Sequence, residues 1–424
     1  MKIAIVGTGI AGNVVAHHLH RAGHDLTVFE ATDHVGGHTH THAIELDGET
    51  HQIDTGFIVF NDRTYPNLVG LFDELGVATQ PTSMGFSVRN DASGLEYNGT
   101  TLNGLFAQRR NLLRPAFLGM LAEILRFNRE APRLIDQPGE RPLGDYLADG
   151  NYGRRFIHDY LVPMGAAIWS TDPDRMMRFP ARFFVRFLHN HGMLSVNDRP
   201  TWRVVAGGSA RYVERLIRPW RDRIRLNTPV GSIRRLPHGV LLAARGQAAE
   251  RFDHVVLACH ADQALQILAD PTPDERAVLG ALPYQRNEVA LHTDTSVLPR
   301  NRRAWAAWNY HVDPARSDRV ALTYNMNILQ GLRSRHTFCA TVNATGNIDP
   351  GKILKRLHYA HPLFTLPGVA AQARHAQISG VGRTHYCGAY WRYGFHEDGV
   401  VSALEALRHF DAQADAQRDL HRVA

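Results

Sequence analysis

Lysine is scarce in this sequence, with only Lys2, Lys352 and Lys355 among 424 residues, although the formal net charge is +6. The positive charge therefore comes almost wholly from arginine, whose planar guanidinium makes paired contacts with phosphate and carboxylate groups. Two interpretations stay open: an arginine-rich composition without functional meaning, or attraction to anionic phospholipid or a phosphorylated substrate. No helix-turn-helix, zinc-finger or aromatic RNA-binding motif accompanies the charge, so nucleic-acid binding is not expected.

Cysteine and long apolar runs are also lacking. Cys259, Cys339 and Cys387 lie far apart and form no C-x-x-C pair, which argues against a disulfide framework or a thiolate metal site and fits a reducing compartment. No apolar run approaches the roughly 18 residues that cross a bilayer, and the opening residues show no signal-peptide pattern. We therefore expect a cytoplasmic protein, for which only peripheral contact with the inner face of the membrane stays open.

A chain of 424 residues is too long for one hydrophobic core, because single cores stop growing at roughly 250 to 300 residues. Hydrophobic residues make up 44% and charged residues 21%, which are ordinary values for a globular protein, and no fixed-period repeat occurs. Two interwoven domains are therefore expected, and together they are large enough to enclose a sizeable ligand.

The sequence opens on a strand, a glycine turn and a helix, in that order. The apolar run Ile3–Val6 predicts a parallel strand buried on both faces, Gly7, Gly9 and Gly12 fit G-x-G-x-x-G, and helical spacing follows over 13–21. In this motif the first glycine permits a tight turn, the second lets a pyrophosphate approach the backbone, and the third lets helix and strand pack closely. The helix N-terminus then faces the phosphates.

A second strand, Leu26–Phe29, ends at Glu30, at the spacing where an acid accepts hydrogen bonds from the adenosine ribose. Strand, turn, helix and acid in register predict a dinucleotide-binding fold. Taken alone, this motif allows NAD, NADP or FAD.

Two segments after this acid carry a family resemblance. Residues 31–39, with Gly36, Gly37 and His38, resemble the G-G-R/H turn that lies over the pyrophosphate in the flavin-containing amine oxidase and phytoene desaturase superfamily. Residues 53–57 are similar to that superfamily's D-x-G-x element beside the isoalloxazine ring. The resemblance implies that the cofactor is FAD and that the protein is an oxidoreductase.

A third segment, residues 385–403, reads as a strand, a glycine-aromatic loop and an alanine-rich helix from Gly399. It resembles the superfamily's C-terminal flavin motif, in which backbone amides at the helix start meet the ribityl chain and the pyrimidine end of the ring. A helix N-terminus there stabilises negative charge on the flavin. The segment departs from the motif twice: Ala389 and Tyr390 replace the usual acid, and His396 stands where amine oxidases often have an aromatic residue of the substrate cage.

The resemblance implies FAD contacts from all of these motifs, and also from Val230, because relatives contact adenine through the valine of a P-V-x-x-I strand. His396 is the candidate base, with a hydrogen-bonded structural histidine as the alternative, and Tyr390 and Tyr393 are candidate ring or substrate contacts. The full candidate set for FAD is Gly7, Gly9, Ile10, Ala11, Gly12, Glu30, Ala31, Gly36, Gly37, His38, Thr39, Thr55, Gly56, Phe57, Val230, Gly388, Asp398, Gly399 and Val400.

A G-G-S turn at Gly207–Ser209, also like the superfamily, returns the chain to the cofactor domain. The expected fold is α/β, with a Rossmann-like FAD-binding domain interwoven with an α+β substrate domain. The FAD-binding domain is predicted to comprise residues 1–60, 201–270 and 371–424, and the substrate domain residues 61–200 and 271–370.

Two apolar stripes in the predicted substrate domain each allow two interpretations. The first follows one helical face over residues 105–125, is flanked by arginines over 109–129, and either packs a core or docks on an anionic membrane. The second, four phenylalanines over 179–187, either belongs to an interior helix or walls a long apolar substrate tunnel.

Histidines crowd the segment 34–51, and His38, His40 and His42 would share one face of a strand, an arrangement that resembles a metal site. No carboxylate or cysteine stands at a matching interval, and the segment lies where the flavin pyrophosphate is expected. We therefore predict no metal.

The scarcity of lysine also bears on the reaction. Many amine oxidases use a lysine that holds a water against flavin N5, but Lys352 and Lys355 are expected in a surface helix. The corresponding position is expected in the strand 287–289, which has no lysine, so this role is predicted to be vacant. Together with the altered aromatic cage, this disfavours a simple amine as the substrate.

A narrower resemblance covers nearly the whole chain. It is similar to a bacterial family of predicted NAD/FAD-binding proteins and to the flavin module of plant cyclopropane fatty acid synthases, through residues 54–61, 63–66, 94–99, 292–294, 304–310, 323–327 and 394–399. This implies desaturation of a fatty-acyl phospholipid, with hydride leaving to the flavin. The alternatives are oxidation of a small amine, or a redox-neutral role as a lipid isomerase or as the partner of a lipid methyltransferase.

Overall fold

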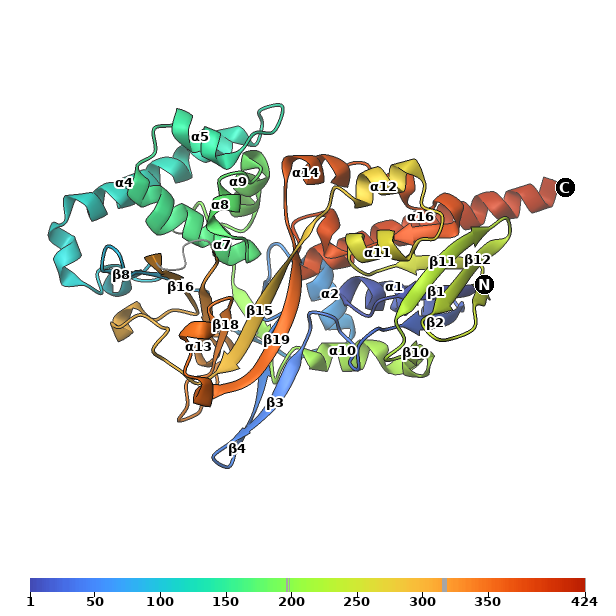
Figure 1. The fold of residues 1–424 in the computed structure, drawn as a ribbon, viewed down its shortest axis with the longest axis horizontal. Helices are drawn as coiled ribbons and strands as arrows, with labels where there is room; N and C mark the ends of the chain where they lie inside the picture. Colours follow the sequence, from blue (N-terminus) through green and yellow to red (C-terminus); the bar gives the residue numbers. More distant parts are fainter. Residues whose placement is uncertain (196, 198, 315–318, 424) are drawn as a thin grey trace.

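Two β-sheets, each with its own helices, organise the chain (Figure 1). The computed structural model describes every residue except 196, 198, 315–318 and 424. We call the part built on the five-stranded sheet the parallel-sheet half and the part built on the seven-stranded sheet the mixed-sheet half. Both chain ends lie at the parallel-sheet half.

The parallel-sheet half confirms the strand, turn and helix read from the first residues. Ile3 and Ile5 join the core beneath helix α1 (Ile10–Arg21), whereas Ala4 and Val6 join the core on the opposite face of the sheet. Both faces are therefore buried, which is why this strand is apolar throughout. In spatial order the strands are β10 (Ile224–Arg225), β2 (Asp25–Phe29), β1 (Lys2–Val6), β14 (His254–Leu257) and β20 (Thr384–Tyr386).

Helices cover one face of this sheet, and a smaller sheet with two helices covers the other. The first face carries α1, α10 (Ala210–Ile217) and α16 (His396–Val423). The second carries β11 (Val230–Leu236), β12 (Gly239–Ala244), β13 (Glu250–Phe252), α11 (Ala261–Ile267) and α12 (Pro273–Leu279).

The last helix begins three residues earlier than the sequence predicted, at His396 instead of Gly399. Glu397 and Asp398 fall in its first turn, where carboxylates interact favourably with the helix dipole. The Asp398 carboxylate also accepts a hydrogen bond of 2.9 Å from the backbone N–H of Phe395, which secures the helix start.

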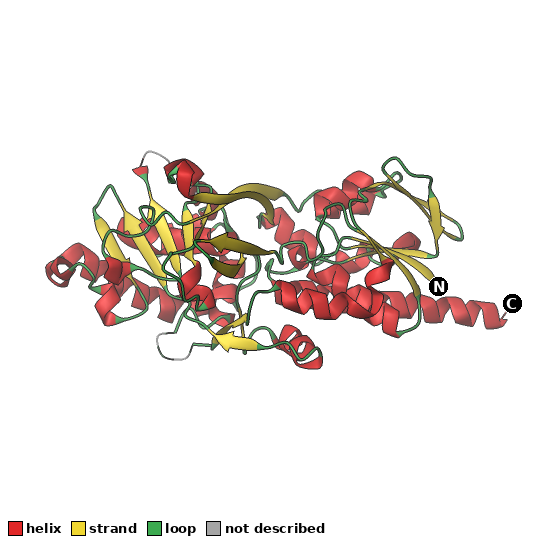
Figure 2. Cartoon of the chain, turned by 90° about the horizontal axis from the view of Figure 1, so that it is seen from below, coloured by secondary structure: helices red, strands yellow, loops and turns green. Residues whose placement is uncertain are grey.

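The mixed-sheet half has strands that are antiparallel to their neighbours except for β16 and β7, which are parallel. In Figure 2 the strands of the two main sheets form separate groups toward the two ends of the molecule. In spatial order the strands of this half are β19 (Ile353–Pro362), β15 (Tyr284–His292), β18 (Cys339–Val342), β17 (Leu322–Asn325), β16 (Trp308–Val312), β7 (Phe86–Asn90) and β8 (Leu95–Asn98).

The prediction of a surface helix around Lys352 and Lys355 is wrong. Lys352 ends a short 3-10 helix, Pro350–Lys352, and Lys355 lies in strand β19. β19 pairs with β15 along nearly its whole length, so the sheet decides the conformation of a segment whose local pattern allowed a helix.

The single helical face expected over residues 105–125 is also wrong. Pro115 begins α4 (Pro115–Glu130), and the preceding residues form α3 (Leu102–Leu105) and a separate 3-10 helix, Arg109–Leu113. Proline has no N–H to donate and is accepted only in the first turn of a helix, so the chain must start a new helix there. In the described residues, no helix combines the length and the apolar character needed to cross a bilayer.

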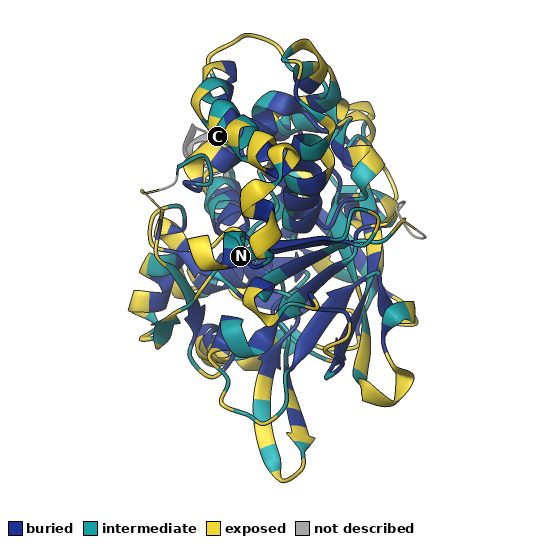
Figure 3. Cartoon of the chain, turned by 90° about the vertical axis from the view of Figure 1, so that its left-hand side faces the viewer, coloured by how far each residue is buried: buried dark blue, intermediate teal, exposed yellow. Residues whose placement is uncertain are grey.

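A hairpin and a small sheet join the two halves. Strands β3 (Thr41–Leu46) and β4 (Glu49–Asp54) form a protruding hairpin (Figure 3). Buried and exposed residues alternate along β3, whereas β4 is half-buried or exposed until its last two residues, which are buried. At its base, the Asp54 carboxylate accepts hydrogen bonds from the Ser209 backbone at 2.9 Å and from the Gln330 side chain at 3.2 Å. The small sheet has the order β5 (Phe60–Asn61), β9 (Trp202–Val205), β6 (Thr79–Pro81).

The other helices divide between the two halves. Those that contribute to the core of the mixed-sheet half are α5 (Leu143–Asp149), α6 (Arg154–Phe156), α7 (Val162–Trp169), α8 (Pro173–Met176), α9 (Ala181–Asn190) and α13 (Met326–Gln330). Those that contribute to the cores of the parallel-sheet half are α2 (Pro66–Glu74), α14 (Leu366–Gln372) and α15 (His375–Ile378).

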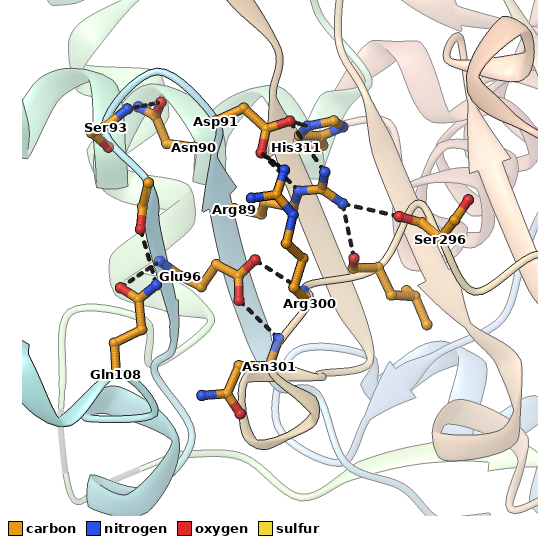
Figure 4. A network of polar contacts seen from close by, with 12 residues as sticks. Arg89, Asn90, Asp91, Ser93, Glu96, Gln108, Ser296, Arg300, Asn301 and His311 are labelled. Carbon is orange, nitrogen blue, oxygen red and sulfur yellow. Dashed lines mark hydrogen bonds and ion pairs between the residues drawn. The ribbon is translucent and has the colours of Figure 1, made fainter.

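A polar network ties together the two chain segments that meet at the edge of the mixed sheet (Figure 4). Arg89 donates to both carboxylate oxygens of Asp91, at 3.0 and 3.2 Å, and His311 contacts the same carboxylate at 2.8 Å. Burial raises the pKa of Asp91, but the bonds from Arg89 and His311 outweigh it and bring that pKa to about 2. Glu96 accepts two backbone N–H groups, those of residues 300–301, so the loop before β16 is held as well.

Candidate active site

The glycine turn after β1 has the shape that the FAD prediction requires. A Cβ on Gly12 would lie 2.1 Å from the carbonyl oxygen of Gly7, and a Cβ on Gly7 would lie 2.8 Å from that of Ala258. A Cβ on Gly9, by contrast, would meet nothing within 4 Å. Two glycines are therefore required by the protein's own packing, whereas Gly9 borders open space at the start of α1, as a pyrophosphate-binding glycine should.

The glycine pair at 36–37 lies directly on this turn. A Cβ on Gly37 would come within 3.0 Å of the Cα of Gly9, and Gly36 and Gly37 have φ values of +124° and +58°, which favour glycine. Gly56 is equally confined, because its Cβ would lie 1.9 Å from the carbonyl oxygen of His38. Segments that the sequence assigned separately to one cofactor thus meet in space.

The start of α16 closes the same region. A Cβ on Gly399 would lie 2.6 Å from the side chain of Ile10, so the first turns of α1 and α16 are in contact. The backbone N–H of Gly388 donates to the Ser402 hydroxyl at 3.0 Å, which fixes the strand glycine against α16, and Val400 is buried beneath it. Burial raises the pKa of Asp398 to about 7.

Glu30 lies at the end of β2 as predicted, and its carboxylate is held on both sides. One oxygen accepts from the backbone N–H and hydroxyl of Thr8, at 3.0 and 2.5 Å, and the other from the backbone N–H and hydroxyl of Thr32, both at 3.0 Å. These four donors occupy the lone-pair directions of the carboxylate. Contact with a ribose would therefore replace one of the threonine hydroxyls, and the ribose role of Glu30 stays a prediction.

The imidazole of His396 contacts two hydroxyl groups. Its Nε2 is 2.9 Å from the Thr39 hydroxyl and 3.0 Å from the Tyr212 hydroxyl, and these two hydroxyls are 2.7 Å apart. The ring stacks on Phe57 with centroids 3.5 Å apart. Burial lowers the pKa of His396 well below its usual value, so the imidazole is neutral at pH 7. These bonds fit both a structural histidine and a base, and the catalytic role stays a prediction.

The two candidate tyrosines differ in their surroundings. Tyr390 is 2% exposed, and its hydroxyl has no hydrogen-bond partner in the described part of the chain. Tyr393 is half-buried and packs on Phe183 and Phe187, with centroid distances of 4.5 and 5.6 Å. Val230 is buried at the first position of β11, where it pairs with Ala244.

His38 supplies a second indication that a ligand fits here. Its Nε2 is buried and has no hydrogen-bond partner among the described residues. The carbonyl oxygen of the same residue accepts from the backbone N–H of Phe57 at 2.8 Å, so its position is fixed. A buried polar atom without a partner is costly unless a ligand or water satisfies it. The glycine turn and His38 together fit FAD, and they are the residues that would hold its pyrophosphate.

His34, His40 and His42 form a stack of rings at the start of the hairpin. His40 lies between His34 and His42, with ring centroids 4.1 and 4.0 Å away, and burial lowers the pKa of His40 to about 4 and that of His42 to about 3. His42 accepts from the Lys355 ammonium at 3.2 Å. Over residues 1–423, the unplaced positions aside, no group of three histidine, cysteine, aspartate or glutamate side chains is arranged to hold a metal.

Asn287, in the strand where the lysine position was expected, is fully buried. Its side-chain amide contacts His361 at 2.8 Å and accepts from Asn343 at 2.7 Å. His361 in turn faces His38, with ring centroids 5.4 Å apart, and burial lowers the pKa of His361 to about 3. The position expected for the lysine is therefore occupied by Asn287, whose neutral amide pairs with the neutral imidazole of His361.

A narrow apolar cavity of about 80 Å³ lies in the mixed-sheet half. One of its walls is Phe395, the residue before His396. Of the four phenylalanines over 179–187, only Phe187 reaches it; the other three are buried in the core, so the interior-helix interpretation holds for most of that stripe. Other walls are Met84, Phe86, Met164, Ile168, Trp202 and Trp308.

A larger and more polar cavity of about 540 Å³ adjoins the apolar one. The two share three wall residues: Tyr65, His191 and Phe395. Arg63 and Arg392 line the larger cavity and are exposed, whereas its two carboxylates, Glu397 and Asp398, are buried.

The sequence motifs do not foresee every contact of this site. His361 comes from a segment that no motif touches. Tyr212 lies in the helix after the G-G-S turn, and His191 follows the phenylalanine stripe that was considered as a tunnel wall, but the contact of Tyr212 with His396 depends on pairing between distant parts of the chain. Phe395 was inside a motif, but its place between two cavities was not foreseeable from spacing.

Comparison with known proteins points to one family. A sequence model described as flavin containing amine oxidoreductase matches residues 10–318. A Mycobacterium tuberculosis protein named as a flavin-containing monoamine oxidase is 24% identical over 324 residues, which cover 73% of this chain and 65% of the relative. The chain thus spans less than two thirds of the length of that curated relative.

Solved structures share the fold over nearly the whole chain. Cyclohexylamine oxidase from Brevibacterium oxydans superposes with a TM-score of 0.71 and 17% identity, covering 98% of this chain and 99% of the other. A fatty acid isomerase from P. acnes superposes with a TM-score of 0.67 and 17% identity, covering 96% and 98%. At this identity the likeness concerns the fold alone, and it confirms the predicted α/β architecture.

Proposed function

The chain belongs to the flavin containing amine oxidoreductase family, and we propose that it is an FAD-dependent oxidoreductase that dehydrogenates the acyl chain of a lipid. Bound flavin would supply the hydride acceptor. The chain's own residues bind the substrate, keep water from it and hold the neighbouring proton. Within the family, the choice of substrate depends on the cavities.

The apolar cavity, which Phe395 helps to line, carries the proposal. Its walls are aliphatic, aromatic and thioether side chains, the groups that line pockets for apolar ligands. Phe395 stacks on Phe187 at 4.9 Å and directly precedes His396 in the chain, although His396 itself lines neither cavity. The adjoining cavity with Arg63 and Arg392 is suited to a carboxylate or phosphate head.

His396 is the candidate for holding the proton that leaves with the second C–H bond. A neutral imidazole is able to accept a proton, and the Thr39 and Tyr212 hydroxyls fix its Nε2. The depressed pKa of His396 keeps it neutral before the reaction, although it also limits how firmly the proton is held.

Oxidation of a small amine is the second candidate, because the M. tuberculosis relative and the Brevibacterium structure bear amine-oxidase names. An ammonium group favours a carboxylate partner. Among the described residues that line the apolar cavity none is a carboxylate. In the adjoining cavity both oxygens of Glu397 already accept from residues 67–68, and Asp398 accepts from the Phe395 backbone and pairs with Arg392 at 3.3 Å. The likeness to a fatty acid isomerase keeps a redox-neutral lipid reaction as a third candidate.

Anaerobic mixing of the purified FAD protein with candidate substrates separates these three. Dioleoyl phosphatidylglycerol in mixed micelles is expected to bleach the flavin absorbance, and mass spectrometry of the recovered lipid is expected to show a loss of two hydrogens. Cyclohexylamine and putrescine serve as the amine arm. Bleaching by amines alone would contradict the proposal, and a shifted double bond without any bleaching would establish the redox-neutral reaction instead.

A further inference from the structure

The mixed-sheet half carries an unusual concentration of exposed leucines. Eight large apolar side chains are exposed in the described residues, and five of them lie between residues 102 and 125. We call these five the docking face: Leu102 (77% exposed), Leu112 (50%), Leu113 (87%), Leu118 (42%) and Leu125 (59%). Single exposed leucines are common, but here five stand within one short stretch of sequence, on α3, the following 3-10 helix and α4, and such a concentration suits an interaction surface.

Helix α4 explains why part of this face is apolar although it does not pack inward. Its inner side already carries a complete core contact through Phe117, Met120 and Phe127, all buried. Leu118 and Leu125 stand seven residues apart and so share the opposite side of the helix. Core packing therefore accounts for one side of α4, whereas Leu118 and Leu125 on the other side stay exposed among the residues that the structure describes.

Arginines outnumber carboxylates in the segment that carries the docking face, even though Arg126 and Arg129 pair with its two glutamates. The guanidinium of Arg109 donates to the Phe106 carbonyl and the Asn103 amide, and that of Arg110 to the Gly94 carbonyl. These acceptors are neutral, so they do not cancel the charge. Over residues 102–133 the sequence has six arginines and two glutamates, Glu123 and Glu130.

We propose that the docking face binds the surface of an anionic bilayer, with its leucines in the interfacial region and its arginines at the lipid headgroups. Apolar side chains combined with basic ones are what interfacial binding requires. Each arginine near an anionic surface adds about 1 kcal/mol.

A second copy of the chain fits this face less well. A two-fold contact would bring the same patch of each subunit together, and the arginines of one copy would then oppose those of the other. Like charges in that position repel. Bilayer phosphates, by contrast, supply the opposite charge along the whole face.

The docking face lies in the mixed-sheet half, with α4 at the end of the molecule away from both chain ends (Figure 1). The inference does not depend on the proposed reaction, because it rests on exposure and charge at residues that line neither cavity. A protein that oxidised a small amine would still bind a bilayer through this face.

Flotation of the FAD-loaded protein with lipid vesicles tests the proposal. The protein is expected to float with vesicles of 70% phosphatidylcholine and 30% phosphatidylglycerol, to remain behind with pure phosphatidylcholine, and to be released from the anionic vesicles by 0.5 M salt. Leu113→Ser/Leu125→Ser is expected to weaken binding at least tenfold. The matched control is Leu226→Ser/Val381→Ser, which removes two exposed apolar side chains elsewhere and is expected to bind as the unmodified protein does.

A second pair of variants tests the charge. Arg109→Gln/Arg110→Gln is expected to weaken vesicle binding about 30-fold, or about fivefold for each arginine. The control, Arg218→Gln/Arg221→Gln, removes two exposed arginines of the parallel-sheet half and is expected to have no comparable effect. Flavin absorbance and thermal unfolding show that each variant is folded.

Three results would overturn the proposal. One is no flotation with anionic vesicles; another is equal loss of binding in the test and control variants. The third is a dimer, seen by light scattering, that dissociates when Leu113 and Leu125 are replaced, because a second copy would then cover the face.

Discussion

The two halves of the molecule shape their cavities in different ways. In the parallel-sheet half the fit depends on backbone approaching backbone, as at Gly12 and Gly56, where a single added carbon would overlap a carbonyl oxygen. In the mixed-sheet half the apolar cavity is walled by side chains, including Met84, Met164 and Met193, which are unbranched and adaptable. We therefore expect that few substitutions are tolerated at the glycines of the parallel-sheet half, and that more are tolerated in the walls of the apolar cavity in the mixed-sheet half.

The largest expected effect contrasts two glycines of one turn. Gly12→Ala places its Cβ 2.1 Å from the Gly7 carbonyl oxygen, so we expect a loss of more than about 4 kcal/mol in the free energy of unfolding, seen as insoluble protein or early thermal unfolding. Gly9→Ala has φ −63° and open space, so the apoprotein is expected to change by less than about 1 kcal/mol.

The same Gly9→Ala protein is nevertheless expected to lose FAD, because its methyl group points into the predicted pyrophosphate space. Titration of the apoprotein with FAD is expected to show at least a tenfold weaker affinity. A Gly9→Ala protein that purifies with full flavin content would show that the pyrophosphate does not lie at this glycine.

The junction between the halves gives the next largest effect. Asp54→Ala removes the acceptor for Ser209 and Gln330 and for the Thr41 hydroxyl, which donates at 2.5 Å. Leaving buried donors unpaired costs about 1 to 3 kcal/mol each, so we expect a loss of about 3 kcal/mol in urea unfolding. Asp54→Asn keeps one acceptor oxygen and is expected to lose less. Equal losses in both variants would mean that the negative charge, and not the hydrogen bonds, matters here.

Acid is expected to weaken the protein through its buried histidines. The folded pKa of His361 is about 3, below the ordinary value of 6.5, so the unfolded chain binds this proton between those values and the folded chain does not. Stability therefore falls as the pH drops below 6.5. From pH 7 to pH 5, His361 is expected to account for a loss of about 2 kcal/mol, which His361→Gln should remove.

Urea unfolding of both proteins at pH 7 and pH 5 measures this difference. His238→Gln, which replaces an exposed histidine before β12, is the control. If wild type and His361→Gln lose the same free energy on acidification, His361 does not remain neutral in the folded protein.

The smallest expected effect is that of a substitution in the mixed-sheet half. Ile168→Trp adds bulk to the wall of the apolar cavity, so we expect the flavin content to be unchanged and the affinity for an acyl lipid to fall about tenfold, or about 1.4 kcal/mol. Quenching of tryptophan or flavin fluorescence by added lipid gives the affinity. Val381→Trp, at an exposed position, is the control. Unchanged lipid binding in Ile168→Trp would place the acyl chain elsewhere.

This contrast also explains what could be read from the sequence. The roles of Gly7, Gly9 and Gly12 could be predicted from the sequence, because each glycine meets a backbone requirement that is local and is the same in every fold of this type. The same holds for Gly36 and Gly37, which fold onto Gly9.

The rest depended on distant parts of the chain. Tyr212 and Thr39 meet at His396 across separations of 184 and 357 residues, and no local pattern records such meetings. Lys355 was misassigned to a helix because its strand is decided by pairing with β15. The helix boundary at Pro115, by contrast, could have been predicted from the sequence, since a proline in the interior of a helix interrupts it.

The contact between Asp91 and His311 has a consequence for synthesis on the ribosome. The two residues are 220 positions apart, and the segment from α10 to α11, which belongs to the parallel-sheet half, emerges between them. At a synthesis rate of roughly 5 to 20 residues per second, about 11 to 44 s pass between the synthesis of the strand with Arg89 (β7) and that of its partner β16. During that interval the edge of β7 that later pairs with β16 is unpaired, and an unpaired strand edge is a template for non-native pairing.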